Sequence, residues 1–126
     1  MAVKSAQDEK DLKIFYRMLI DNLRKHHVLP PPYSYFQSIF KHIIIAGRGF
    51  LYFTEFQGKL ISANLYFCFK DTALCSYSAQ LNSYSKYRPN YFLHWKAIEN
   101  FHGQSYKFYN FGGTDPNNQG LLFFKR

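Results

Sequence analysis

The chain has 126 residues, 47% of them hydrophobic and 19% charged, which is the composition of one soluble globular domain. Its 16 Lys and Arg against 8 Asp and Glu give a formal net charge of +8, which favours anionic partners, although a basic surface also serves solubility alone. The only two cysteines, Cys68 and Cys75, exclude a disulfide framework and a four-thiolate zinc site, so we expect reduced thiols and a cytoplasmic location. No apolar run approaches the roughly 20 residues that a membrane-spanning helix needs.

Two amphipathic segments open the chain. From Asp8 to His27, apolar residues recur at three- and four-residue spacing between an acidic first turn and a basic last turn, which predicts a helix. The prolines at 30–32 end it, and the same spacing from Tyr33 to Ile43 predicts a second, shorter helix. We expect the two helices to pack as a pair.

Three strands are predicted next, over Phe50–Phe56, Lys59–Phe69 and Ala73–Ala79, joined by turns at Gln57-Gly58 and at residues 70–72. In the second strand, alternate apolar residues favour one core face, formed by Ile61, Ala63, Leu65, Phe67 and Phe69. Cys68 and Cys75 are placed symmetrically about residues 71 and 72, so we expect them to face each other across the hairpin.

The rest of the chain alternates helix and strand. Residues 81–89 are predicted to form a loop, and Asn90 is expected to cap a helix that runs to His102. Another strand is predicted over Tyr106–Phe111, followed by a loop at residues 112–118 and a final element from Leu121. This order predicts an α/β (α+β) fold with a mixed sheet covered by helices. The histidines all fall on predicted helices, where we expect them on the surface and not in a catalytic or metal site: His26, His27, His42, His94 and His102.

Four short motifs occur in a recognisable order: Tyr77-Ser78-Ala79, the segment from Arg88 to Ile98 with its Pro-Asn and Leu-His-Trp-Lys-Ala-Ile, the segment from Tyr109 to Gly113, and Gly120 to Lys125. Together they resemble the FemAB group of GNAT-like acyltransferases, over about residues 11–125. The resemblance implies a GNAT-like mixed, mostly antiparallel sheet flanked by helices, and transfer of an acyl group to an amine. In characterised members, an amino acid moves from aminoacyl-tRNA to a peptidoglycan precursor that carries a UDP or lipid pyrophosphate.

The same resemblance implies the site residues. Lys125 is expected near the reacting centre, where its charge stabilises the oxyanion formed when an amine attacks an ester carbonyl. The expected substrate-binding residues are Tyr77, Arg88, Asn90, Gly112, Gly113, Asp115 and Phe124. The family's usual Asp before Phe-Gly-Gly is Asn110 here, which departs from the pattern. No cofactor is expected, since the aminoacyl-tRNA is a substrate.

Family members continue beyond the position of Lys125 and usually carry a second GNAT-like domain. We therefore expect the sheet to be incomplete at the C-terminus and its edge near Phe123 and Phe124 to pair with a partner domain or a second copy of the chain.

Two alternatives remain at this stage. Ordinary GNAT enzymes hold the pyrophosphate of coenzyme A on a Gly-rich loop before the third helix, through backbone N–H groups. Here residues 85–90 contain no glycine and Pro89 lacks an N–H, which disfavours acetyl-coenzyme A, although Lys86 and Arg88 still offer positive charge. The first alternative is thus an acetyl-coenzyme A-dependent N-acetyltransferase. The second is a non-catalytic module that binds RNA or a protein.

Overall fold

The structure is a computed structural model that describes residues 1–104, 106–110 and 121–123. Its described strands form one sheet in chain order: β1 (Ala2–Ser5), β2 (Gly49–Phe56), β3 (Lys59–Phe69), β4 (Thr72–Gln80), β5 (Phe108–Asn110) and β6 (Leu121–Phe123). The helical elements are α1 (Glu9–Lys25), α2 (Tyr33–Ile39), the π-helical turn η1 (Phe40–Ile44), the 3-10 helix η2 (Asn82–Tyr87) and α3 (Pro89–Gly103).

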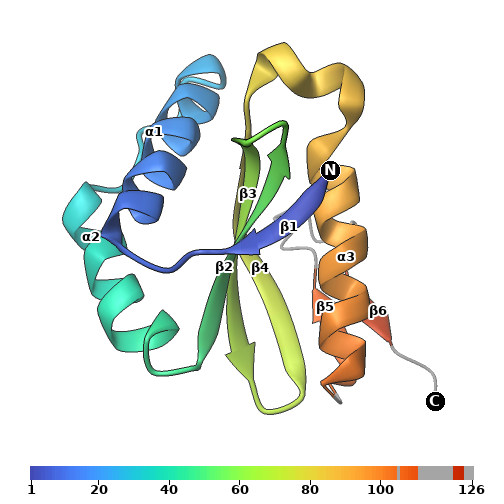
Figure 1. The fold of residues 1–126 in the computed structure, drawn as a ribbon. Coiled ribbons are helices and arrows are strands. Elements are labelled where there is room, and N and C mark those ends of the chain that lie inside the picture. Colours follow the sequence, from blue (N-terminus) through green and yellow to red (C-terminus); the bar gives the residue numbers. More distant parts are fainter. Residues whose placement is uncertain (105, 111–120, 124–126) are drawn as a thin grey trace.

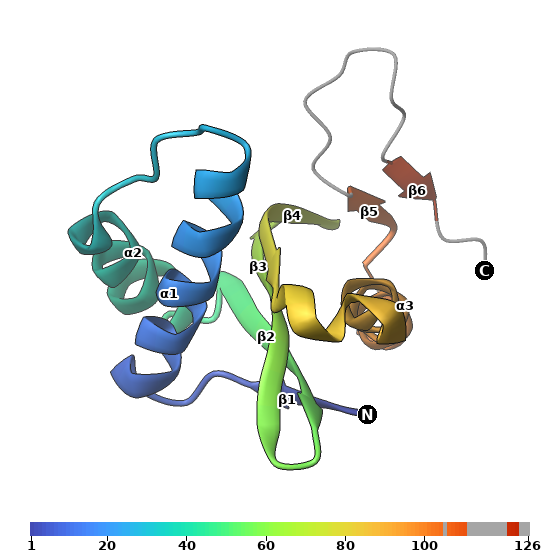
Figure 2. The same ribbon diagram turned by 90° about the horizontal axis from the view of Figure 1, so that it is seen from above.

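Helices cover both faces of the sheet, α1 and α2 on one side and α3 on the other (Figures 1 and 2). All neighbouring strands are antiparallel except β4 and β5, which are parallel. The predicted mixed, mostly antiparallel sheet flanked by helices is therefore confirmed. In the described residues, no helix is long and apolar enough to cross a membrane.

The helix α1 forms where its sequence predicts it. Asp8 caps its start, with the carboxylate accepting a 3.1 Å hydrogen bond from the Asp11 N–H, and Arg24 and Lys25 occupy the last turn. Its apolar face, which includes the fully buried Phe15, packs on the sheet. The helix nevertheless ends at Lys25, two residues before the predicted end.

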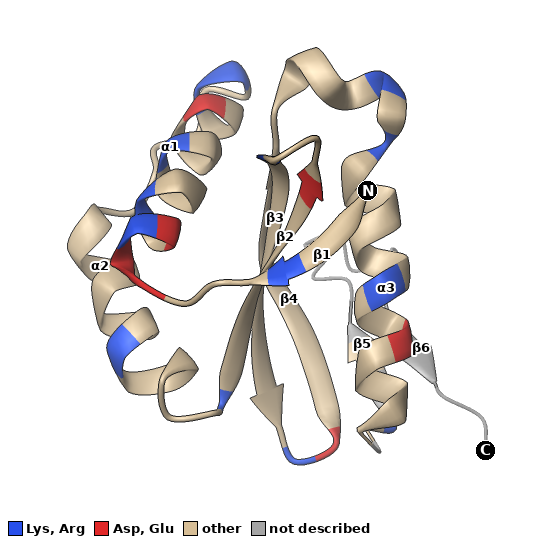
Figure 3. Cartoon of the chain, in the orientation of Figure 1, with Lys and Arg blue, Asp and Glu red and all other residues tan. Residues whose placement is uncertain are grey.

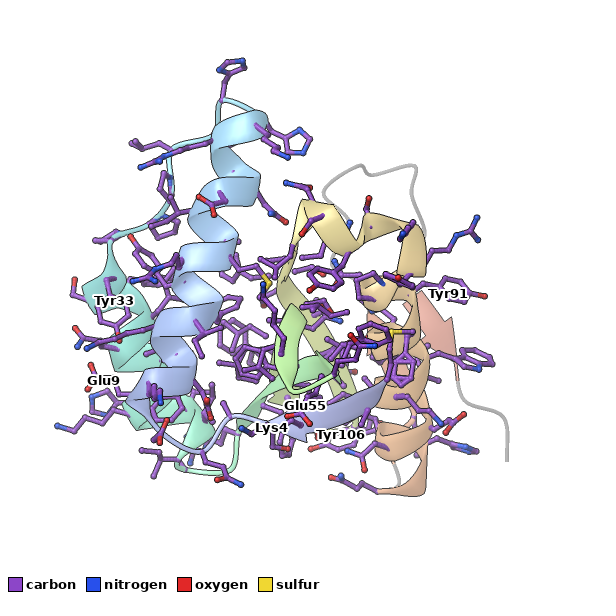
Figure 4. All side chains as sticks on the ribbon, turned by 45° about the horizontal axis from the view of Figure 1, so that its top comes forward. Lys4, Glu9, Tyr33, Glu55, Tyr91 and Tyr106 are labelled. Atoms are coloured by element: carbon purple, nitrogen blue, oxygen red, sulfur yellow. The ribbon has the colours of Figure 1, made fainter. Side chains whose placement is uncertain are left out.

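The second predicted helix changes its winding. It is α-helical over Tyr33–Ile39 and continues as the wider turn η1, in which the Ile45 N–H donates to the Phe40 carbonyl at 3.0 Å. On the outer side of the helix pair, the Tyr33 hydroxyl and the Gln37 amide both donate to Glu9 Oε1, at 3.3 and 2.6 Å (Figure 4). The two helices are thus paired as expected.

The expectation of one core face on β3 is wrong, because this strand is buried on both faces. Ala63 and Leu65 pack under α1 and α2, as predicted, but Asn64 and Tyr66 on the opposite face are also fully buried, under α3. In β3, the alternation of apolar and polar residues therefore distinguishes an apolar buried face from a partly polar buried face, and not a buried face from an exposed one. The polar side chains between them need internal hydrogen-bond partners.

The register of the β3–β4 hairpin also differs from the predicted one. Cys68 pairs with Ala73, and Cys75 with Tyr66, so the turn lies at Lys70-Asp71 and the cysteines are diagonal neighbours on the α3 face instead of direct partners. Lys70 takes a left-handed conformation, with φ of 49°, which lets the strand return one residue earlier than its composition indicates. Both thiols are free.

Candidate functional site

The described pairing of the parallel strands β4 and β5 joins Thr72, Ala73 and Leu74 to Phe108–Asn110. Cys75 to Gln80 continue without a neighbour on that side among the described residues. A bulge on the β3 side follows this pairing: Leu65 of β3 pairs with Tyr77 and the next residue pairs with Cys75, so Ser76 is left without a β3 partner. We call Cys75 to Gln80, the part of β4 with no described neighbour on that side, the open edge of β4.

The far end of the open edge is closed by a side chain from α1. Asn22 donates from Nδ2 to the Gln80 carbonyl at 2.8 Å, and its Oδ1 accepts from the Gln80 N–H at 3.0 Å. The Leu81 N–H instead points to β3, where it donates to the Ile61 carbonyl. Because backbone groups alternate sides along a strand, the N–H and C=O of Ser78, like those of Gln80, face the open edge.

The segment between the open edge and α3 leaves few free amides. It folds as the 3-10 helix η2, in which N–H groups after the first turn donate within the helix; those of Tyr84 and Arg88, at its two ends, donate to the carbonyls of Leu81 and Ser85. Pro89 is the first residue of α3 and has no N–H. A loop of outward-facing amides, of the kind that cradles a pyrophosphate, is therefore not formed by residues 82–89.

Exposed cations surround this end of the sheet. Arg24 and Lys25 end α1, while Lys86 and Arg88 precede α3, and Figure 3 shows both groups at the same end of the molecule. The opposite end of β4 carries the Lys70-Asp71 turn, where the two charges are of opposite sign. Anionic ligands are thus favoured at the end of the open edge.

A chain of hydrogen bonds runs under α3 from the open edge to His94. Ser78 Oγ donates to Asn64 Oδ1 at 2.5 Å, and Asn64 Nδ2 donates to the Tyr66 hydroxyl at 3.0 Å. The Tyr66 and Tyr109 hydroxyls are 2.7 Å apart, and the Tyr109 hydroxyl lies 2.6 Å from His94 Nδ1. Three of these residues are almost fully buried, whereas Ser78 is exposed at the edge and His94 is half-buried.

Burial dominates the acid–base properties of this chain. It raises the pKa of Tyr66 and of Tyr109 well above the ordinary value of a phenol, and it lowers the pKa of His94. All three side chains are therefore neutral near pH 7. The neighbouring Cys75 thiol, 3% exposed, has its pKa raised to about 12 by burial, so it is not a nucleophile in this state.

The structure places the predicted site residues as follows. Tyr77 lies on the open edge but on the face under α2, where its ring meets Phe36 edge-on and its hydroxyl bonds that of Tyr35. Arg88 and Asn90 lie at the start of α3, on the other face. These three residues therefore share one end of the sheet but not one face. Five predicted residues lie outside the described residues: Gly112, Gly113, Asp115, Phe124 and Lys125.

Two expectations at the start of α3 change. Asn90 does not cap the helix, because α3 begins at Pro89 and Arg88, with φ of 51°, takes the capping position without a side-chain bond. Asn90 instead lies in the first turn, with its Oδ1 buried and without a hydrogen-bond partner in the described part of the chain. A buried acceptor of this kind is available to a bound donor group.

Sequence reasoning missed the hydrogen-bonded chain. His94 was expected on the helix surface, whereas it is half-buried against Tyr109. The only signal in the sequence was the polar Asn64 within a strand that also carries Tyr66, because such a pair on a covered face requires internal partners. Among the described residues, no group of three His, Cys, Asp or Glu side chains is placed to hold a metal ion.

A separate cleft of about 790 Å³ lies between α1 and the β2–β3 hairpin. Its lining carries Lys4, Lys59 and three further cations against four acidic residues, among them Glu55, so its charges nearly balance. Its strand residues come from β1, β2 and β3; Leu81, which follows β4, also lines it, but none of the residues Cys75 to Gln80 does. We therefore do not count this cleft as part of the candidate site.

The chain belongs to the family described as Acetyltransferase (GNAT) domain, whose profile matches residues 1–126. No curated protein matches the chain.

Solved structures show the same fold at low sequence identity. FemX superposes with a TM-score of 0.80 at 15% identity, over 93% of this chain and 45% of the FemX chain. The ribosomal-protein-S18-alanine N-acetyltransferase from Escherichia coli has a TM-score of 0.70 at 16% identity, over 86% of this chain and 63% of that one. An aminoglycoside acetyltransferase from an uncultured soil metagenomic sample, in complex with sisomicin, has a TM-score of 0.66 at 10% identity, over 91% and 78% of the two chains. This chain thus spans less than half of FemX and under two thirds of the alanine acetyltransferase.

Proposed function

We propose that the chain is the acyl-transfer domain of an aminoacyltransferase, which moves an amino acid from tRNA to an amine of a peptidoglycan precursor. The observation that carries the proposal is the basic end of the molecule, where two pairs of exposed cations, Arg24 with Lys25 and Lys86 with Arg88, lie at the end of β4 and residues 82–89 form no amide cradle. The substrates follow the resemblance of the motifs to the FemAB group, and the match in fold to FemX supports the same direction.

The two candidate donors, coenzyme A and tRNA, need different phosphate-binding sites. Coenzyme A needs a tight site for its pyrophosphate, and η2 with Pro89 uses or lacks the amides that would form it. A tRNA instead spreads its charge over many phosphates, which separate cations such as Lys25 and Lys86 bind without a cradle. The basic end of the molecule therefore favours a polyanionic donor.

The reaction needs no enzyme nucleophile. An aminoacyl ester is already activated, so an amine that is held close to its carbonyl carbon attacks directly. This agrees with the thiols of the structure, since burial raises the pKa of both Cys68 and Cys75. We keep Lys125 as the group that stabilises the oxyanion, with Gly112, Gly113, Asp115 and Phe124 as substrate contacts beside it.

The direct test uses the purified chain with radiolabelled aminoacyl-tRNA and a UDP- or lipid-linked precursor. We expect aminoacyl transfer, and tRNA binding that weakens with salt at a log–log slope of about −3 if four cations contact phosphates. Neutralising Lys25 and Lys86 together, by substitution with Ala, lowers the slope. The matched control neutralises Lys70 and Lys107, which are exposed at the opposite end of the sheet, and leaves the slope unchanged.

The outcomes separate the alternatives. Acetyl transfer from acetyl-coenzyme A, without aminoacyl transfer, makes the chain an N-acetyltransferase and refutes the proposed donor. Salt-sensitive tRNA binding without transfer from either donor makes it a binding module.

A further inference from the structure

Several large aromatic side chains stand outside the core around the start of α3. Tyr91 and Trp95 are 72% and 59% exposed, Tyr87 is also exposed, and Tyr84 is partly exposed. None of them belongs to the core cluster under α1 and α2 or to the one under α3. We call these four residues the aromatic strip. Because they do not serve the packing of this domain, and exposed apolar patches mark interaction sites, the strip is a candidate binding surface.

The strip runs from η2 into the first two turns of α3. Tyr84 and Tyr87 are one 3-10 turn apart, and their ring centroids are separated by 6.2 Å. Tyr91 and Trp95 are four residues apart, which places them on one side of α3. Tyr91 extends away from the body of the molecule (Figure 4). Only residues 88–90 separate the two pairs, so all four rings lie around the start of α3.

Phe56 supports the η2 end of the strip from β2. Its ring centroid lies 5.0 Å from that of Tyr87, with the ring planes 32° apart, and 6.3 Å from that of Tyr84. On the same strand, Thr54 donates from Oγ1 to the Pro89 carbonyl at 3.1 Å, which holds the start of α3 against β2. The rings are therefore in place before a ligand arrives, which lowers the entropy cost of binding.

Two lysines lie over rings of the strip. Lys59 Nζ is 5.4 Å from the ring centroid of Tyr84, and Lys86 Nζ is 5.1 Å from that of Tyr87. Both lysines are exposed, and a cation–π contact at an exposed site is weak. A flat group that stacks on either ring can therefore displace the lysine, and the ammonium group then binds an anion beside that flat group.

The sequence around the strip carries no negative charge. Residues 72–98 contain no Asp or Glu, whereas Lys86 and Arg88 are both exposed. The next cation, Lys96, is engaged by Glu99 at 3.8 Å, so it adds little free charge at the far end of the strip. Exposed rings interleaved with cations are the combination that binds single-stranded nucleic acid, since every base has a face to stack and every nucleotide has a phosphate.

We propose that the aromatic strip binds unpaired nucleotides of RNA, with their bases stacked on the rings and their phosphates held by Lys59, Lys86 and Arg88. An apolar protein or lipid surface would use the rings but not the cations, whereas a nucleotide uses both. The inference deepens the proposed function and rests on it for the source of these nucleotides, which is the single-stranded end of the tRNA that carries the amino acid.

The first arm of the test uses the purified chain and RNA hexa-adenylate. Affinity is measured by the anisotropy of the labelled oligomer, and the emission of Trp95, the chain's only tryptophan, reports whether a base reaches the strip. We expect saturable binding with quenching of Trp95. An abasic hexamer, which has the same phosphates, is expected to bind about 5-fold more weakly or worse and without quenching. Equal binding of the two oligomers, or binding that leaves Trp95 emission unchanged, refutes the proposal.

The second arm removes single rings. Tyr87→Leu is expected to weaken hexa-adenylate binding by about 5- to 150-fold, whereas Tyr87→Phe, which keeps the ring, is expected to bind like the wild type. Tyr91→Leu repeats the test at the most exposed ring of the strip, where the core is not disturbed. The matched control is Phe69→Leu, which removes a 62% exposed ring beside Lys70 at the opposite end of the sheet and leaves the affinity unchanged.

Two results of these measurements would contradict the proposal. One is wild-type affinity in folded Tyr87→Leu and Tyr91→Leu proteins, with folding checked by circular dichroism. The other is an absence of hexa-adenylate binding together with self-association that Tyr91→Leu abolishes, which would make the strip a protein interface.

The third arm identifies the source of the base. Coenzyme A also joins a base to phosphates, so it is titrated alone and as a competitor of hexa-adenylate. We expect no displacement of the oligomer at equal concentration. Coenzyme A that displaces the oligomer, and that loses affinity in Tyr87→Leu, would assign the strip to coenzyme A and overturn the proposal.

The transfer assay separates this inference from the proposed function. Tyr87→Leu is expected to raise KM for the aminoacyl-tRNA about 5-fold or more, with KM for the amine unchanged. If transfer occurs and the donor KM does not change, this inference fails and the proposed function stands. If no donor supports transfer but hexa-adenylate binds and depends on the rings, the proposed function fails and the strip remains an RNA-binding surface.

Discussion

Removal of the Tyr66 hydroxyl tests how much stability the buried chain contributes. Tyr66→Phe keeps the ring in place, since the ring packs edge-on against Phe101 at 5.1 Å, and deletes one oxygen. That deletion leaves Asn64 Nδ2 without its acceptor at a fully buried position and removes the hydrogen bond between the Tyr66 and Tyr109 hydroxyls. Tyr52→Phe makes the same chemical change under α3, but the partner of Tyr52 is the exposed Asn100, whose amide water can satisfy.

The expected cost of each change follows from the partner that is left behind. An unsatisfied buried polar group costs about 1–3 kcal/mol, and two neighbours are affected, so Tyr66→Phe is expected to lower the free energy of unfolding by about 3 kcal/mol. Tyr52→Phe removes one hydrogen bond without leaving a buried group unsatisfied, so the free energy of unfolding is expected to fall by the net contribution of that bond, about 1 kcal/mol. With an unfolding entropy of about 2.1 cal/mol/K per residue, 1 kcal/mol corresponds to roughly 4 °C for a chain of this length, which gives Tm decreases of about 12 °C and about 4 °C.

Calorimetry or circular dichroism of the two variants, at one concentration and pH, measures the difference directly. Equal decreases in Tm, or a larger decrease in Tyr52→Phe, would show that the chain is not a continuous buried network.

Other substitutions test separate features. In urea denaturation, Gly49→Ala is expected to destabilise the fold by about 1–3 kcal/mol, because a Cβ at this position would lie 2.6 Å from the Tyr66 carbonyl oxygen. The control is Gly103→Ala, whose added Cβ meets nothing within 4 Å and which is expected to be neutral or stabilising. Burial lowers the pKa of His94 in the folded state below the ordinary value of about 6.5, so the unfolded chain binds a proton first as the pH falls. The contribution of His94 to stability is therefore complete above about pH 6.5 and decreases below it. His94→Gln is expected to flatten this part of a plot of urea midpoint against pH. In a form of the protein that is active in aminoacyl transfer, Lys125→Ala is expected to lower kcat by about two to three orders of magnitude with little change in KM. Lys125→Arg is expected to restore little of this activity. A near-normal kcat in Lys125→Ala would show that Lys125 does not stabilise the oxyanion.

Elements with strong local signals were predicted well. The capped, amphipathic α1 and the two hairpins around β3 follow from residue spacing and turn composition, because their own residues supply most of what defines them. β1 was not predicted. Its four residues carry no clear alternation, and it forms because β2 has a free edge to which Ala2–Ser5 can pair.

The candidate site was less accessible from the sequence. The motif at residues 77–79 lies on β4, where neighbouring side chains alternate between the two faces of the sheet. Only the register of β4 shows that Ser78 meets Asn64 under α3 and that Tyr77 lies under α2. The partners in the chain under α3 are separated by as many as 43 residues, between Tyr66 and Tyr109. A serine, an asparagine and two tyrosines are each ordinary at such positions, and their alignment is a property of the packed sheet alone.

The amide of Asn22 blocks one position along the edge of β4. With one donor and one acceptor on Gln80, this side chain takes the place of a residue in a neighbouring strand. A strand that pairs with β4 on this side therefore has to end before Gln80. Exchanging Asn22 for a smaller side chain would free the N–H and C=O of Gln80 and extend the edge available for pairing by one residue.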